Sequence, residues 1–252
     1  MRNGVSAVVA ALLLITTAVG ARAKDEPDDL ATSSTCYYGV GPRATVAAAS
    51  DSNQKVLLRT LVLVDRARPS IAPTIMRRVI EEFGRIGLVL DVTYQPITLH
   101  GTDSAQLMKE TRAHLARARI TGFELVHVLT GADLTIDGNQ IAGQAYCLGG
   151  IRYAKYYWAM SISETTWPES WGVGYKTFFK GGAALVAAHE IGHVLGALHQ
   201  HGNCAENAKS ALRASEATIC TVMDTTLYYS KLRFGRAERA VMRGFAIRYG
   251  SP

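Results

Sequence analysis

The hydrophobic positions along the chain follow two different spacings from residue 55 onward. Five short runs are apolar throughout or alternate between apolar and polar residues, as β-strands do: 56–64, 88–94, 123–129, 141–147 and 157–162. Four longer stretches are apolar at helical spacing or over their whole length: 71–86, 104–118, 183–195 and 235–249. Because strands and helices alternate over the first two thirds of the chain, the pattern predicts an α/β fold with a mostly parallel sheet.

The helical stretches also predict which side chains are buried. In the first helix the predicted buried face consists of Ile71, Ile75, Met76, Val79, Ile80, Phe83 and Ile86. In the second helix it consists of Leu107, Met108, Thr111 and Leu115. In the last helix it consists of Phe234, Ala237, Val241, Met242 and Phe245. Ser70 precedes the first helix and is a residue type that caps helix N-termini, so we expect its side chain to cap that helix.

The first residues have the pattern of a secretory signal peptide rather than of a fold. A basic Arg2 precedes an apolar run over 5–19, and Ala21-Arg22-Ala23 follows as a small-residue cleavage site. The run is too short to favour a membrane anchor, and no other segment is long enough to span a bilayer. We therefore expect a signal peptide over 1–23 and an exported chain: extracellular, or periplasmic if the source is bacterial.

The rest of the chain divides into an extension and one domain. Residues 24–54 are polar and weakly periodic, and are interpreted as an N-terminal extension that could serve as a short pro-segment. Residues 55–252 contain no internal repeat or linker and are expected to form one catalytic domain.

Charge and composition narrow the choice of partners. The net charge is +6, and removal of the signal peptide with its two arginines lowers it to +4. Lys and Arg form no block and do not interleave with aromatic residues, which argues against a nucleic-acid partner. Four cysteines, an even number in an exported chain, predict two disulfides without fixing which of three pairings occurs: Cys36, Cys147, Cys204 and Cys220.

The chemistry is concentrated in the stretch His189-Glu190-x-x-His193-x-x-Gly196-x-x-His199. His189 and His193 are four residues apart, so both imidazoles lie on one face of a helix and can bind one ion. Gly196 can adopt the left-handed conformation that ends a helix, after which His199 can approach the same ion. Three histidines leave one position open for water, as in catalytic zinc sites, and Glu190 projects from the helix where it can act on that water.

The other histidines have ordinary interpretations. His100 and His114 are expected at the surface or on a helix, and His127 as a hydrogen-bonded core residue in a buried strand. His201 lies two residues beyond the motif spacing, so His199 is the favoured third ligand.

The extended motif resembles that of the metzincin zinc endopeptidases. That family also has a methionine-containing turn below the metal, and Met223 in Cys220-Thr221-Val222-Met223-Asp224 matches it. The stretch 143–150, together with Cys204 and Cys220, is most similar to the reprolysin or adamalysin group. Gln200 stands where that group usually has Asp, and no Tyr lies two residues after Met223.

The resemblance implies a twisted mixed sheet, an active-site helix and a smaller irregular or helical C-terminal subdomain. It implies one zinc ion per chain, with His189, His193 and His199 as ligands and Glu190 as the general base. It also implies that a protein or peptide substrate pairs with an edge strand near 141–147, and that residues around 225–229 line the specificity pocket. We expect the enzyme to be a monomer.

Two other functions fit the same metal motif. A zinc hydrolase of another amide, such as a cell-wall crosslink, would use the same chemistry. A non-catalytic secreted module could bind zinc only for folding, although the presence of Glu190 beside the intact histidines argues against it.

Cys36 has two competing interpretations. Some metzincins hold a propeptide thiol on the zinc, and Cys36 lies in the extension that precedes the catalytic domain. Alternatively, Cys36 pairs with Cys147, and Cys204 pairs with Cys220. The even number of cysteines, the short segment between Cys204 and Cys220, and an extension of only about thirty residues favour the disulfides.

Overall fold

The computed structural model describes residues 54–165, 181–199, 221–223 and 232–250. Along the chain the strands are β1 (Val56–Asp65), β2 (Leu88–Ile97), β3 (Leu125–Thr130), β4 (Thr135–Ile136), β5 (Asn139–Gln140), β6 (Gly143–Ala145) and β7 (Met160–Glu164). The α-helices are α3 (Ile71–Arg85), α4 (Ser104–Arg117), α6 (Gly182–Val194) and α8 (Arg236–Tyr249), and a 3₁₀ segment, η1, covers Gly150–Tyr156.

Five of the strands form one mixed sheet in the order β2-β1-β3-β7-β6. The pairs β1–β2, β1–β3 and β3–β7 are parallel, whereas β6 runs antiparallel to β7 at the edge. The central strand β3 is buried along its whole length, as expected for a parallel strand covered on both faces. The α/β class and the mixed sheet predicted from the sequence are thus confirmed.

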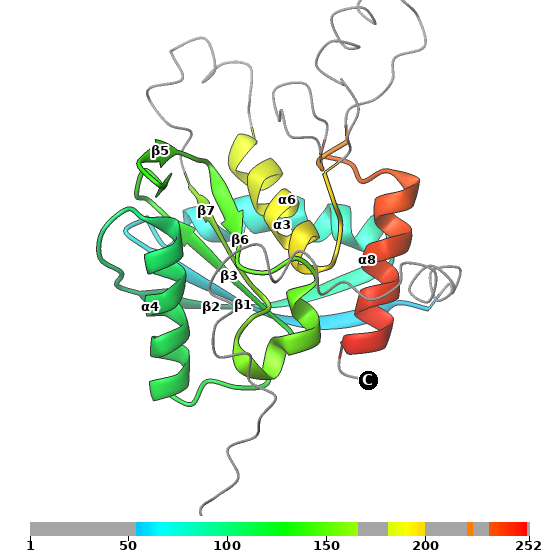
Figure 1. The fold of residues 1–252 in the computed structure, drawn as a ribbon. Helices are drawn as coiled ribbons and strands as arrows, with labels where there is room; N and C mark the ends of the chain where they lie inside the picture. Colours follow the sequence, from blue (N-terminus) through cyan, green and yellow to red (C-terminus); the bar gives the residue numbers. More distant parts are fainter. Residues whose placement is uncertain (1–53, 166–180, 200–220, 224–231, 251–252) are drawn as a thin grey trace, which may run out of the picture.

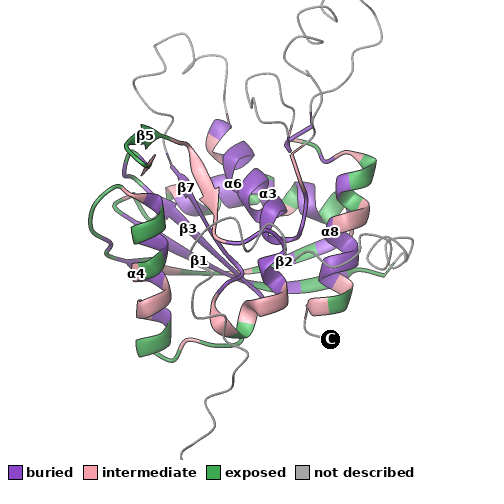
Figure 2. Cartoon of the chain, in the orientation of Figure 1, coloured by how far each residue is buried: buried purple, intermediate pink, exposed green. Residues whose placement is uncertain are grey.

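Helices cover both faces of this sheet (Figure 1). Buried side chains of α3, α6 and α8 join one face of the sheet in the larger core, while α4 packs on the opposite face in a smaller core. Figure 2 shows α6 and the strands beneath it as buried, whereas α4 has an exposed outer side. Helix α6, which carries the histidine motif, is therefore buried within the larger core.

The start of the first helix differs from its prediction. Ser70 occupies the N-cap position of α3, but its backbone is helical (φ −70, ψ −16) and its side chain makes no capping hydrogen bond. An N-cap side chain normally reaches the helix from an extended backbone, which Ser70 lacks. Asp103 does have that extended backbone, and it caps α4 by accepting from the Gln106 N–H at 2.8 Å.

Two predicted strands are shorter or shifted. The strand expected over 157–162 begins only at Met160, because η1 occupies the preceding segment and Tyr157 has a positive φ of 60°. The strand expected over 141–147 is paired only over Gly143–Ala145.

The buried face of the last helix also differs from its prediction. Ala237 is exposed, whereas Glu238 and Arg243 are buried among the apolar side chains. Arg243 donates to the carbonyl oxygens of Ile86 and Gln54, at 2.8 and 2.9 Å. A polar side chain with such internal partners can be buried at little cost, and apolar spacing alone does not reveal it.

Several predictions fall outside the described residues. They include the signal peptide, all of the extension except Gln54, and most of the C-terminal subdomain. Within the described ranges, none of the helices combines the length and apolar character needed to cross a membrane.

Candidate metal centre

Helix α6 ends in a hydrogen-bonded turn that brings the third histidine back toward the first two. Gly196 has a positive φ of 89° directly after the helix. Its N–H donates to the carbonyl of His193 at 2.9 Å, and the Ala197 N–H donates to the carbonyl of Gly192 at 2.9 Å, which is the Schellman pattern. A Cβ atom at Gly196 would also stand 2.7 Å from the Phe245 ring. The helix stop predicted at Gly196 is therefore present, for both conformational and packing reasons.

The three histidines of the motif meet at one point. The Nε2 atoms of His189, His193 and His199 are 3.0 Å apart in each of the three pairs. His189 and His193 are almost fully buried, and His199 is half-buried. Among the described residues this is the one group of three or more potential ligand side chains close enough to share a metal ion.

Hydrogen bonds on the opposite ring nitrogens fix the protonation of the two buried histidines. His189 Nδ1 lies 2.7 Å from the carbonyl oxygen of Val222, and His193 Nδ1 lies 2.7 Å from that of Ala197. A carbonyl only accepts, so each Nδ1 carries the hydrogen. Burial also lowers the pKa of His189 to about 4 and holds the pKa of His193 well below its ordinary value, so both rings are neutral.

The protonation states of the two histidines show whether their Nε2 atoms can bind zinc. In a neutral imidazole with a hydrogen on Nδ1, Nε2 has only a lone pair, so His189 and His193 cannot hydrogen-bond each other through these atoms. Lone pairs 3.0 Å apart in a buried site repel each other unless a cation lies between them. Three imidazole nitrogens with an open fourth position are the ligand set of catalytic zinc sites, and the residues fit that ion.

Glu190 is buried beside this cluster but is not part of it. Only 7% of the residue is exposed, and burial raises the pKa of its carboxyl to about 8. A backbone hydrogen bond from Ala145 acts in the opposite direction and stabilises the charged form, so the Ala145 N–H is the donor. The carboxyl of Glu190, which lies on α6, is thereby held against the edge strand β6.

Gly143 allows the edge strand to lie directly against the metal helix. A Cβ atom at this position would stand 2.7 Å from Val186 Cγ1, 2.8 Å from Glu190 Cγ and 2.9 Å from the carbonyl oxygen of Ile162. The sequence interpretation did not assign Gly143 a role. A glycine inside a predicted strand often marks a close backbone approach, and that signal could have found it.

Met223 lies beneath the helix, where the turn motif places it. Its side chain is fully buried, and a Cβ atom at Gly192 would stand 2.7 Å from its sulfur. The preceding residue, Val222, supplies the carbonyl that orients His189. The turn thus contacts the metal helix both through the methionine and through the backbone.

The remaining histidines include a confirmed core residue. His127 is fully buried in β3, with Nδ1 2.8 Å from Ser161 Oγ and Nε2 3.0 Å from Ser163 Oγ. Burial lowers the pKa of His127 to about 3, so the ring is neutral. His100 is exposed, and His114 lies half-buried on α4, as expected.

Some of the predicted site residues lie outside the described residues: Cys36, Cys204, Cys220, His201, Gln200 and the pocket segment 225–229. Cys147 is buried and takes part in a disulfide. It is the only cysteine in the described part of the chain, so its partner lies elsewhere, and which cysteine that is stays a prediction.

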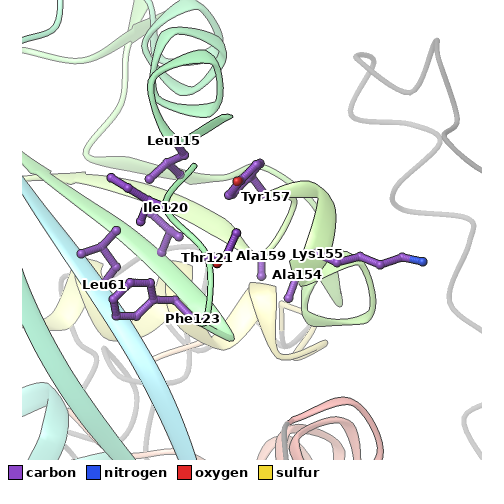
Figure 3. A pocket seen from close by; sticks show the side chains of 11 residues that line it. Leu61, Leu115, Ile120, Thr121, Phe123, Ala154, Lys155, Tyr157 and Ala159 are labelled. Atoms are coloured by element: carbon purple, nitrogen blue, oxygen red, sulfur yellow. The ribbon is translucent and has the colours of Figure 1, made fainter. Parts of the chain in front are cut away.

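A small apolar cavity lies apart from the histidines, between the end of α4, the start of β3 and η1 (Figure 3). Its volume is about 60 Å³, and its lining includes Leu61, Leu115, Ile120 and Phe123. Figure 3 shows the Lys155 side chain pointing away from these residues. The cavity brings no set of reactive groups together, so the candidate chemistry remains at the histidines.

The histidine cluster and its surroundings fit a zinc metallopeptidase. Residues 86–200, which include the whole histidine motif, match the family described as metallo-peptidase family M12B, reprolysin-like. This match and the histidine cluster support a metallopeptidase, as the sequence motif indicated.

Two solved structures are similar to the chain at low identity. Archaemetzincin from Methanopyrus kandleri is 17% identical with a TM-score of 0.49, and the match covers 81% of this chain and 98% of that one. A zinc-dependent peptidase from Methanocorpusculum labreanum is 16% identical with a TM-score of 0.46, with coverage of 72% and 99%. No match was found among curated protein sequences. The assignment rests on the family match and the histidine cluster, not on these two structures.

Proposed function

We propose that the protein is an exported zinc endopeptidase that cleaves within extended peptide segments, with Glu190 as its general base. The observation that carries the proposal is the convergence of three histidine Nε2 atoms, 3.0 Å apart, next to a buried glutamate on the same helix. A buried carboxyl with a raised pKa beside a metal site is a common feature of hydrolytic centres.

In the proposed hydrolysis the histidines bind the metal and Glu190 transfers the proton. His189, His193 and His199 would hold the ion, which supplies Lewis-acid polarisation of a carbonyl group and acidification of water. Glu190 takes a proton from the attacking water and delivers it to the leaving amine. Burial favours the protonated carboxyl and the Ala145 N–H favours the carboxylate, so both states that this proton transfer needs are accessible.

The edge strand supports an extended peptide as the substrate. Among the described strands, β6 is the last of the sheet and pairs on one side with β7, and Gly143 of β6 lies next to Glu190. A peptide added to the other side would be recognised through its backbone, and its bonds would pass close to the metal centre. Backbone recognition does not require a chain end, which favours an endopeptidase.

Export is part of the proposal and rests on the sequence. The basic residue, apolar run and small-residue cleavage site over 1–23 support it. Expression of the full chain, followed by N-terminal sequencing of the released protein, tests this point. A mature N-terminus at Lys24 is expected, and an intact chain that stays inside the cell would contradict export.

A cleavage profile tests the chemistry. Zinc-loaded mature protein is incubated with a mixed peptide library, and the products are identified by mass spectrometry, with zinc-loaded Glu190→Gln as the control for contaminating proteases. Internal cleavages that are absent from the control are expected. Hydrolysis of cell-wall fragments without peptide cleavage would indicate the other amide hydrolase, and no hydrolysis of either substrate would indicate a binding module.

A further inference from the structure

A buried glutamate on the C-terminal helix holds the turn that contains Met223. Glu238 lies on α8 and is only 4% exposed. Its carboxylate accepts a hydrogen bond from the Thr221 hydroxyl at 2.6 Å and another from the Gly235 N–H. A carboxylate buried in this way is costly unless it is well hydrogen-bonded, so these donors help to keep it inside.

Thr221 transmits this contact to the turn. Its hydroxyl donates to Glu238 and accepts from the Met223 N–H at 3.2 Å. The residue between them is held from the other side, because the Val222 N–H donates to the carbonyl of Arg233 at 3.0 Å. The three consecutive residues 221–223 are therefore fixed to the segment that leads into α8.

Residues 221–223 also fix the orientation of the first histidine, His189. The Val222 carbonyl lies 2.7 Å from His189 Nδ1. This contact keeps the hydrogen on Nδ1 and directs the Nε2 lone pair toward His193 and His199. A continuous series of hydrogen bonds thus runs from Glu238 through Thr221 and the turn to His189.

We propose that Glu238 and Thr221 are positioning residues for the metal centre, which set the orientation of His189 through the Val222 carbonyl. The inference rests on the proposed role of His189 as a metal ligand. Neither residue belongs to the histidine cluster. The competing explanation is that Glu238 only stabilises the start of α8, through its contact with the Gly235 N–H.

The two explanations differ in what happens to the metal. If the series of hydrogen bonds orients His189, its interruption weakens zinc binding by roughly 10–100-fold, as is typical of groups that orient metal ligands. If Glu238 only caps the helix, its removal lowers the unfolding temperature and leaves the zinc affinity of the folded protein unchanged.

The experiment measures zinc dissociation constants by chelator competition on the mature protein, together with thermal unfolding of each apo form. Thr221→Val removes both hydrogen bonds of the hydroxyl, Glu238→Gln removes part of the acceptor capacity, and Thr221→Ser keeps the hydroxyl. Thr111→Val is the matched control, because Thr111 is a fully buried threonine whose hydroxyl bonds only locally, to the Leu107 carbonyl at 2.8 Å.

We expect zinc binding to weaken by roughly 10–100-fold in Thr221→Val and Glu238→Gln, and by less than about 3-fold in Thr221→Ser and Thr111→Val. Unchanged zinc affinity in both Thr221→Val and Glu238→Gln would overturn the inference, as would an equal loss in Thr111→Val. If Thr221→Val does not fold, Glu238→Gln and Thr221→Ser decide. Wild-type protein that binds zinc without cleaving peptides would contradict the proposed endopeptidase, while the zinc affinities would still decide this inference.

Discussion

Gly143 lies so close to Glu190 that a methyl group on its α-carbon would stand 2.8 Å from Cγ of the glutamate. The same methyl group would meet Val186 Cγ1 at 2.7 Å and the Ile162 carbonyl at 2.9 Å, so it could not be accommodated without movement. The first residue of the edge strand therefore determines how closely that strand approaches Glu190.

The first prediction follows from this contact. Gly143→Ala should push β6 away from α6 or displace Glu190, and should lower kcat by ~10-fold or more, since misplacement of a catalytic group by about 1 Å is costly. Zinc content should stay at one ion per chain, because none of the three atoms nearest to that methyl group belongs to a histidine. Steady-state kinetics and metal analysis measure the two effects.

Gly84→Ala is the control for the first prediction. Gly84 lies in α3, and a Cβ atom there would meet nothing within 4 Å. Alanine in a helix is favoured over glycine by about 1 kcal/mol, so this variant should be slightly more stable and fully active. Normal kcat in Gly143→Ala would show that Gly143 has no part in placing Glu190.

The second prediction separates metal binding from chemistry. Glu190→Gln keeps the shape of the side chain and removes the base, so hydrolysis should fall by at least ~10²-fold while zinc is retained. His193→Ala should lose both zinc and activity, because it removes one of three ligands. Parallel measurements of zinc content and turnover distinguish the variants. Near-normal turnover in Glu190→Gln would disprove the role given to the glutamate.

The third prediction concerns acid stability and His127. Burial lowers the pKa of this histidine to about 3 in the folded protein, whereas the ordinary value is 6.5. The unfolded chain therefore binds a proton that the folded chain does not bind between these two pH values. Stability should decrease as the pH falls below about 6.5, by up to ~1.4 kcal/mol per pH unit from this one group.

Replacement of His127 isolates that contribution. The free energy of unfolding is measured in urea at pH 7 and pH 5 for the zinc-loaded wild type and His127→Asn. The loss on acidification should be smaller by ~2 kcal/mol in His127→Asn. An identical pH dependence in both proteins would show that His127 is not a buried neutral group in the folded protein.

The part of the site carried by one continuous motif could be predicted from the sequence, and the part that depends on distant contacts could not. The spacing of His189, His193 and His199 and the stop at Gly196 follow from helix geometry, which is local. The Val222 carbonyl that orients His189 is a backbone atom 33 positions away, and every residue carries such an atom. The family resemblance located the turn that contains Val222, but nothing in the sequence singled out this carbonyl as the partner of His189.

The same reason explains why Glu238 escaped the sequence interpretation. Apolar spacing placed Ala237 on the buried face of the last helix, and a glutamate near a helix start is an ordinary surface residue. Its burial depends on Thr221, 17 positions earlier along the chain. The fold class was easier to predict, because it needs only the alternation of strand and helix patterns and not the identity of distant partners.

The final prediction concerns Met223 as a packing residue under the metal helix. Leucine is similar in volume and apolar, so Met223→Leu should lose under about 1.5 kcal/mol of stability and should keep its zinc. Met108→Leu is the control, since Met108 is equally buried but lies on α4 in the other core. Met223→Glu would bury a carboxylate against Gly192 and should abolish folding and zinc retention together. Urea unfolding and metal analysis test both substitutions, and a stable, fully zinc-loaded Met223→Glu protein would refute the placement of Met223 beneath the histidines.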